Sequence, residues 1–206
     1  MRGPNIDREK LKQELLDVCQ AIVAEEGVAA VSARRLAGRL GCAVGSLYNV
    51  YGSLDEIIME INGRTLDEID RQVAEVVAAG GGAATVMRGL GLRYLAYSRD
   101  HYHLWSTLLE YPRHQDIALP DWYQAKVDAI FARIRDALLP ATGGDRARAD
   151  RAGKVLWSGF HGISALAARG RLQSVRAEDA RAMVDSLVAY YLAGLAAEES
   201  GPARGD

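Results

Sequence analysis

The sequence predicts an all-α fold, with a small N-terminal helical domain followed by a larger helical domain. Apolar residues recur at three- and four-residue intervals through most of the 206 residues, which is the helical period. Glycine and proline clusters separate these stretches, and no segment alternates regularly enough to predict a β-strand. A net charge of −2 and an apolar content of 49% are typical of a soluble globular chain that buries a core.

Three helices are expected in the first fifty residues. An apolar stripe predicts a first helix that ends at Gly27, a residue suited to a left-handed cap. Ser32 can cap a second, short helix that runs to Gly41. A third short helix spans about 44–50, and Val50 is expected in the core.

The rest of the chain is predicted to be a series of longer helices. Ser53 and Glu56 form a capping box at the start of a helix over 54–79, which the glycines of "AGGGA" end. Prolines and glycine-containing turns separate the further helices, which are expected at 84–99, 101–111, 121–139, 146–169 and 177–197.

The two short helices have the spacing of a helix-turn-helix. This motif needs a small residue on its first helix, a glycine in the turn and an apolar anchor on the second helix, and Ala37, Gly41 and Leu47 occupy those steps. The outward face of the second helix is then Val44, Gly45, Ser46, Tyr48 and Asn49. A plain packing unit of two short helices would show the same spacing.

The order of these parts favours a helix-turn-helix over a plain packing unit of two short helices. Residues 14–62, which contain "VSARRLAGRLGCAVGSLYNVYGSLDEI", resemble the N-terminal domain of the tetracycline-repressor (TetR-type) family of transcriptional regulators. The residues that match the family pattern in register are Gly41, Ser46, Leu47, Tyr48, Tyr51, Gly52 and Ser53. The resemblance implies sequence-specific binding of a double-stranded DNA operator by a homodimer. Leu54 stands where the family commonly has a phosphate-binding lysine, and Ala43 stands where a serine usually opens the helix.

Candidate DNA contacts follow from residue chemistry on this implied face. Phosphate contacts are expected from Ser32, Arg34 and Tyr48. Ser46 and Asn49 can hydrogen-bond base edges, Val44 can touch a thymine methyl, and Gly45 permits close approach of the backbone. Arg34 could instead be a solvated base without a partner.

A second resemblance concerns the larger domain. "WSGFHG", which is Trp157 to Gly162, resembles the Trp-His-Gly element of one class of effector domain in this family. It implies a cavity for an apolar or aromatic small-molecule effector, with candidate lining residues Tyr94, Trp105, Leu109, Trp122, Trp157 and His161. The alternative is that most of these side chains are ordinary core, and His161 could be an interface histidine.

The last two helices are candidates for a dimer interface. Helix 146–169 is apolar over a wide arc, and helix 177–197 carries a matching stripe, so the pair could form a four-helix contact with a second copy. Gly153, Gly159 and Gly162 would allow helices to approach closely. Completion of a monomeric core is the alternative.

Other classes of protein fit less well. No catalytic motif accompanies His101, His103, His114 or His161, and neither cysteine lies in a metal-binding pattern, so no catalytic residue, metal or cofactor is expected. No apolar run is long enough to span a membrane, and a cytoplasmic protein is expected. We expect a DNA-binding domain at 1–52 and an effector and dimerisation domain at 53–206. Together they would form a repressor that leaves its operator when a ligand binds. The alternative is a helical sensor or adaptor with weak or no DNA binding.

Overall fold

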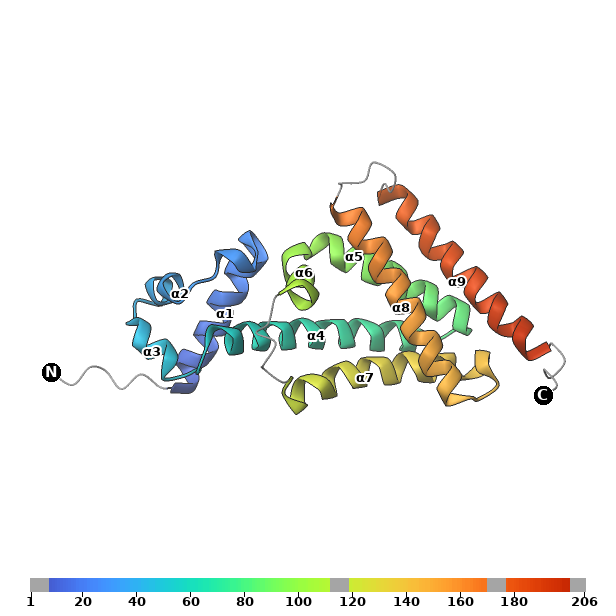
Figure 1. Cartoon of the computed structure of the whole chain (residues 1–206), viewed down its shortest axis with the longest axis horizontal. Helices are drawn as coiled ribbons and strands as arrows, with labels where there is room; N and C mark the ends of the chain where they lie inside the picture. Colours follow the sequence, from blue (N-terminus) through green and yellow to red (C-terminus); the bar gives the residue numbers. More distant parts are fainter. Residues whose placement is uncertain (1–7, 112–118, 170–176, 201–206) are drawn as a thin grey trace. The chain divides into compact units, whose positions relative to one another are not determined.

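The structure is a computed structural model, and it describes residues 8–111, 119–169 and 177–200 (Figure 1). The described residues are helical apart from short connections, which confirms the predicted all-α fold. The helices are α1 (Arg8–Glu26), α2 (Ala33–Leu40), α3 (Val44–Tyr48), α4 (Leu54–Ala78), α5 (Ala83–Asp100), α6 (Tyr102–Glu110), α7 (Asp121–Leu138), α8 (Arg146–Arg169) and α9 (Ala177–Ser200). Short 3-10 turns lie at Val28–Ala30 and Leu139–Thr142.

Local capping signals explain where the N-terminal helices begin and end. The Ser32 hydroxyl accepts a hydrogen bond of 3.3 Å from the Arg35 amide at the start of α2, as expected for an N-cap. Gly41 ends that helix in the left-handed region, with φ 64°. α3 has no side-chain cap because its N-cap position holds Ala43.

Three local expectations differ in detail from the structure. Gly27 has the expected positive φ of 85°, but its ψ of 165° is extended, so it is not a left-handed cap. In a capping box the Glu56 carboxylate would accept from the Ser53 amide, but it accepts from the Gly52 amide at 2.9 Å. The other half of the box is present, because the Glu56 amide donates to the Ser53 hydroxyl. α3 ends at Tyr48, two residues before the predicted end, and Val50 is only partly buried against the core.

The chain divides into two compact units. The described part of the first unit runs to Leu66 and resumes at His101 with α6, and the second holds Asp67–Asp100 and the described chain from Pro120. α4 therefore contributes its first half to one unit and its second half to the other. The core of the first unit comes from α1, α2, α3, α4 and α6, with Leu15, Ile22, Leu36, Leu47, Ile57, Ile61 and Leu104 among its buried residues.

The second unit packs α5, α7, α8 and α9 around a separate core. α8 and α9, the orange and red helices of Figure 1, lie side by side. The closest approach of α5 is at Gly91, where an added Cβ would lie 2.7 Å from the Phe160 ring and 2.6 Å from Val184. Among the glycines expected to allow close packing, Gly159 lies against Leu187, whereas Gly162 has open space.

Three further features bear on function. In the described part of the chain, no helix combines the length and apolarity needed to cross a bilayer. Cys19 is fully buried, and burial raises the pKa of its thiol to about 12, so it stays protonated as a core residue. The described ranges hold no cluster of three potential metal ligands, and His114 lies outside them.

Candidate functional site

α2 and α3 form the helix-turn-helix that the spacing predicts. After the left-handed turn at Gly41, the Cys42 amide donates to the Ala37 carbonyl at 3.0 Å. Ala37 is buried where the two helices meet, and Leu47 is only 1% exposed, so it anchors α3 on the core. Because α3 has only five residues, this anchor and the turn fix its orientation more than its own hydrogen bonds do.

The anchor leaves the other face of α3 open. Two large apolar side chains project there, Val44 at 38% exposed and Tyr48 at 50%. Gly45 and Asn49 are exposed and Ser46 is partly buried, and a Cβ at Gly45 would meet no neighbouring atom. This face carries no charge, and it presents a methyl-bearing side chain, two hydroxyls and one carboxamide.

The start of α2 supplies the phosphate-binding candidates. The Ser32 oxygen accepts from the Arg35 amide, which leaves its hydroxyl proton available to donate to a phosphate. Arg34 is exposed, and it makes no ion pair with any residue that the structure describes.

Arg35 has a structural role at this corner. Its guanidinium donates to both oxygens of Glu26 at the end of α1 and to the Ala30 carbonyl at 3.3 Å. The hydrogen bond from Arg35 lowers the pKa of the Glu26 carboxyl below its ordinary value. Arg35 therefore joins α1 to α2, a role that was not among the expectations from sequence.

Tyr51 and Leu54, which flank Gly52 and Ser53, both pack against the core of the first unit. Leu54, which replaces the expected lysine, is partly buried and packs against the core of the first unit. Tyr51 is only 6% exposed, and its hydroxyl has no hydrogen-bond partner among the described residues. The ammonium of Lys12 lies 5.5 Å from the centre of the Tyr51 ring, within range of a cation-π contact.

Three of the candidate effector-binding residues come together in the second unit. The Tyr94 hydroxyl on α5 and Nδ1 of His161 on α8 form a hydrogen bond of 3.1 Å. Trp157, one turn earlier on α8, stacks on His161 with ring centres 5.7 Å apart. Phe131 of α7 meets the Trp157 ring edge-on at 5.7 Å. Phe131 was not among the residues expected from sequence, because only the packing of α7 on α8 brings it there.

A buried hydroxyl lies further along the same helix. Ser164 follows His161 by three residues, so the two share a face of α8. It is 1% exposed, and its oxygen has no hydrogen-bond partner in the described structure. We call Tyr94, Phe131, Trp157, His161 and Ser164 the α8 cluster.

The other three candidate effector-binding residues lie elsewhere. Trp122 is 38% exposed at the start of α7 and meets Tyr123 edge-on. Trp105 is fully buried and Leu109 is largely exposed on α6, which belongs to the first compact unit. A single cavity lined by all six residues therefore stays a prediction.

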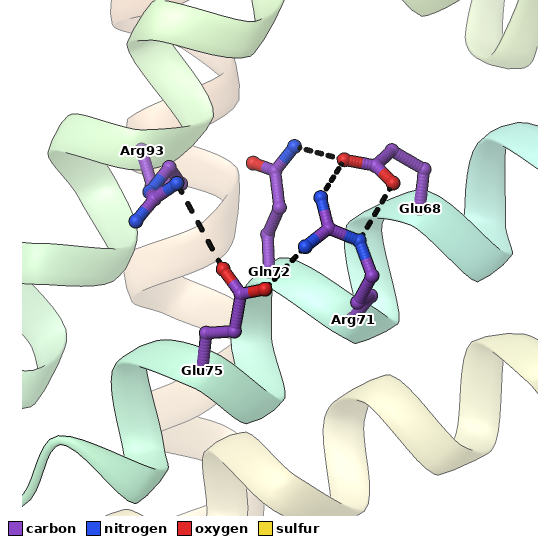
Figure 2. A network of polar contacts seen from close by, with 5 residues as sticks. All are labelled: Glu68, Arg71, Gln72, Glu75 and Arg93. Carbon is purple, nitrogen blue, oxygen red and sulfur yellow. Dashed lines mark hydrogen bonds and ion pairs between the residues drawn. The ribbon is translucent and has the colours of Figure 1, made fainter.

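A charged network occupies the second half of α4. Figure 2 shows Arg71 between Glu68 and Glu75, with the Gln72 amide donating to Glu68 at 2.7 Å. Arg93 of α5 reaches Glu75 at 4.0 Å. The bonds of Arg71 stay within its own helix, and such exposed pairs contribute only a few tenths of a kcal/mol each.

Comparison with known proteins gives a family match over the second half of the chain. The family described as "Tetracyclin repressor-like, C-terminal domain" matches residues 87–191. The HTH-type transcriptional repressor KstR2 of Rhodococcus jostii is 35% identical over 69 residues, which is 34% of each chain. That match spans about a third of the relative's length.

Solved structures match over nearly the whole chain. A protein of unknown function from Rhodococcus sp. RHA1 has a TM-score of 0.74 and 18% identity, covering 94% of this chain and 100% of the other. The transcriptional regulator FadR from Bacillus subtilis, in complex with stearoyl-CoA, has a TM-score of 0.66 and 14% identity, covering 88% and 98%. At these identities the likeness shows the fold.

Proposed function

Because the chain belongs to the tetracycline-repressor-like family, we propose that it is a ligand-responsive transcriptional repressor that binds a palindromic operator as a homodimer. The observation that carries this proposal is the exposed face of α3, held outward by the buried anchor Leu47. Proteins of this family are DNA-binding regulators and not enzymes. The proposed DNA-binding domain is 1–52, and the proposed effector and dimerisation domain is 53–206.

The proposed contacts to DNA are mostly neutral. Ser32, Arg34 and Tyr48 would meet phosphates, while the face from Val44 to Asn49 would enter the major groove. Arg35 is held by Glu26, and Leu54 packs on the core, so neither adds a charge to this surface.

This mode of binding has a measurable signature. Arg34 is the single base among the proposed phosphate contacts of each subunit, so a dimer neutralises two phosphates and the slope of log K against log salt is about −2. A steeper slope would show that basic residues outside the proposed face carry the binding.

The α8 cluster supports an effector site of the Trp-His-Gly class. The stacked rings of Trp157 and His161 suit a flat apolar or aromatic molecule, and the buried Ser164 hydroxyl can satisfy one polar group on it. For release, the effector must favour the DNA-incompetent state over the DNA-competent one, because equal affinity for both shifts no population.

An open groove on α8 and α9 supports the proposed dimer. It has a volume of about 590 Å³ and is lined by Gly159, Ile163, Asp179, Ala182, Met183, Ser186 and Leu187. Tyr190 of α9 is 78% exposed, and Val155 and Leu166 of α8 are exposed as well. A second copy that covers these apolar residues would form the four-helix contact expected from sequence.

Selection of bound sequences from random DNA tests the proposal. We expect a palindrome with half-sites about 34–36 Å apart, or a multiple of that distance, as a two-fold dimer requires. The selected operator then serves to screen apolar and aromatic molecules for release. Failure to enrich any sequence would refute the repressor and favour the sensor or adaptor, and an asymmetric single half-site would refute the dimer.

A further inference from the structure

Arg64 links α4 to α1 through three side chains. Its Nη1 donates to Asp17 at 2.7 Å and to Gln20 at 3.0 Å, and its Nη2 donates to Gln13 at 3.1 Å. The three acceptors lie at helical intervals along one face of α1, so the guanidinium spans about two turns of that helix. The Arg64 side chain is 29% exposed, whereas that of Asp17 is 68% exposed, so the link is sheltered from water on the Arg64 side alone.

The effect of this link depends on where Arg64 lies along α4. Ile57 and Ile61 pack in the core of the first unit, and Arg64 continues the same helical face by one more turn. Leu66, two residues later, is the last residue of α4 in that unit, and Asp67 belongs to the other. Arg64 therefore links α4 to α1 close to the point where α4 passes from one unit to the next.

Apolar packing and a guanidinium fork constrain helices differently. Ile57 and Ile61 share the apolar core of the first unit with residues of α1, and such packing is non-directional, so it does little by itself to fix the direction of α1 relative to α4. Hydrogen bonds from a planar guanidinium to several acceptors have a fixed geometry, so they oppose a change in that direction. The helix-turn-helix shares its core with α1, so its direction follows that of α1.

We propose that Arg64 is a positioning residue that sets the direction of the DNA-reading helices relative to α4, and so sets which half-site spacing the dimer accepts. This inference rests on the proposed function, because spacing has meaning only for an operator-binding dimer. Arg64 touches no DNA in this proposal. It acts by making α1 and the first half of α4 turn together.

The test compares affinities for two operators that differ only in half-site spacing. The first is the operator selected by the wild-type chain, and the second carries one extra base pair at its centre, which rotates one half-site by about 34°. The ratio of the two dissociation constants measures how strongly the dimer prefers one half-site spacing over the other. We expect Arg64→Met, which keeps the apolar stem and loses the fork, to lower that ratio about five- to tenfold.

The chain offers a matched control on the same helix. Arg71→Met removes another arginine of α4, but Arg71 bonds only to Glu68 and Glu75 of its own helix, as Figure 2 shows. This variant should keep the wild-type ratio. A second disruption from the α1 side, Gln13→Ala with Gln20→Ala, changes no charge and should lower the ratio in the same direction as Arg64→Met.

The outcomes separate this inference from the proposed function. A general loss of stability lowers affinity for both operators equally and leaves their ratio unchanged, so an unchanged ratio in Arg64→Met refutes the positioning role. An equal fall in Arg71→Met also refutes it, since charge on α4 would then be the cause. If the wild-type chain selects no DNA, the proposed function fails first. If the wild type prefers one spacing and only the fork variants lose that preference, the positioning role is supported.

Discussion

Replacement of Tyr51 by phenylalanine should stabilise the protein. Tyr51 is 6% exposed, and its hydroxyl has no hydrogen-bond partner among the described residues. Folding therefore removes this hydroxyl from water without replacing the hydrogen bonds that water made to it. The variant Tyr51→Phe keeps the ring in the core and keeps the contact with the Lys12 ammonium. The change therefore isolates the cost of one buried polar group.

The magnitude follows from the cost of an unsatisfied hydroxyl. Such a group costs about 1–3 kcal/mol, and loss of the packing of its oxygen offsets part of the gain. We expect the free energy of unfolding to rise by about 1 kcal/mol, which in a chain of 206 residues raises the melting temperature by roughly 2–4 °C.

The same substitution should change the response to alkaline pH. Burial raises the pKa of the Tyr51 phenol above its ordinary value, and the carboxylate of Glu60 raises it further. The unfolded chain, with a tyrosine pKa of about 10, then loses this proton before the folded chain does. The native state keeps its full stability below about pH 10 and loses it as pH rises toward the folded pKa, so the advantage of Tyr51→Phe grows above that pH.

Urea denaturation at pH 7.5 and at pH 10.5 measures both effects. Tyr48→Phe is the matched control, because the Tyr48 side chain is half exposed and its hydroxyl is open to water. The control should shift stability by less than about 0.5 kcal/mol at either pH. A Tyr51→Phe variant less stable than wild type at pH 7.5 would refute the reasoning, since the hydroxyl would then have to contribute a favourable interaction.

Four further substitutions test other parts of the structure. Gly91→Ala should cost about 1–3 kcal/mol in urea denaturation because its Cβ would meet Phe160, whereas Gly162→Ala, with open space, should be neutral or stabilising. Tyr48→Phe should weaken operator binding severalfold in a gel shift and leave the dimer intact in sedimentation, and a dissociated dimer would contradict its place on the DNA-binding face. Ser32→Ala should lower the free energy of unfolding by about 1 kcal/mol through loss of its cap, and a thermal melt unchanged from wild type would contradict that role.

Much of the fold could be predicted because its signals are local. The caps at Ser32 and Ser53 and the turn at Gly41 depend on residues within four positions of one another, so they can be recognised without knowing how the rest of the chain packs. The expected helices could also be predicted, because their apolar periodicity is visible in the sequence. α3 is the exception in its length, because periodicity defines the ends of a helix less sharply than its middle.

The candidate sites were predictable to different degrees. The exposed face of α3 follows from one anchor, Leu47, and a helical period, so its members were identified from sequence. The α8 cluster needed three helices to meet, and only Tyr94, Trp157 and His161 of its members were among the expected residues. Phe131 had no sequence signal, because nothing local to α7 shows which neighbour it faces.

The amino-acid sequence by itself therefore determined the helices, the caps at Ser32 and Gly41 and the outward face of the helix-turn-helix, because periodicity and capping act over a few residues. Only the tertiary structure decided that Arg35 binds Glu26 while Arg34 stays exposed, that α6 packs with the first unit, and that Arg64 joins α4 to α1. These contacts connect positions on different elements, and their partners are chosen by how the helices pack. The sequence shows that an arginine can donate hydrogen bonds, but the role of each arginine depends on which acceptor the fold brings within hydrogen-bond distance.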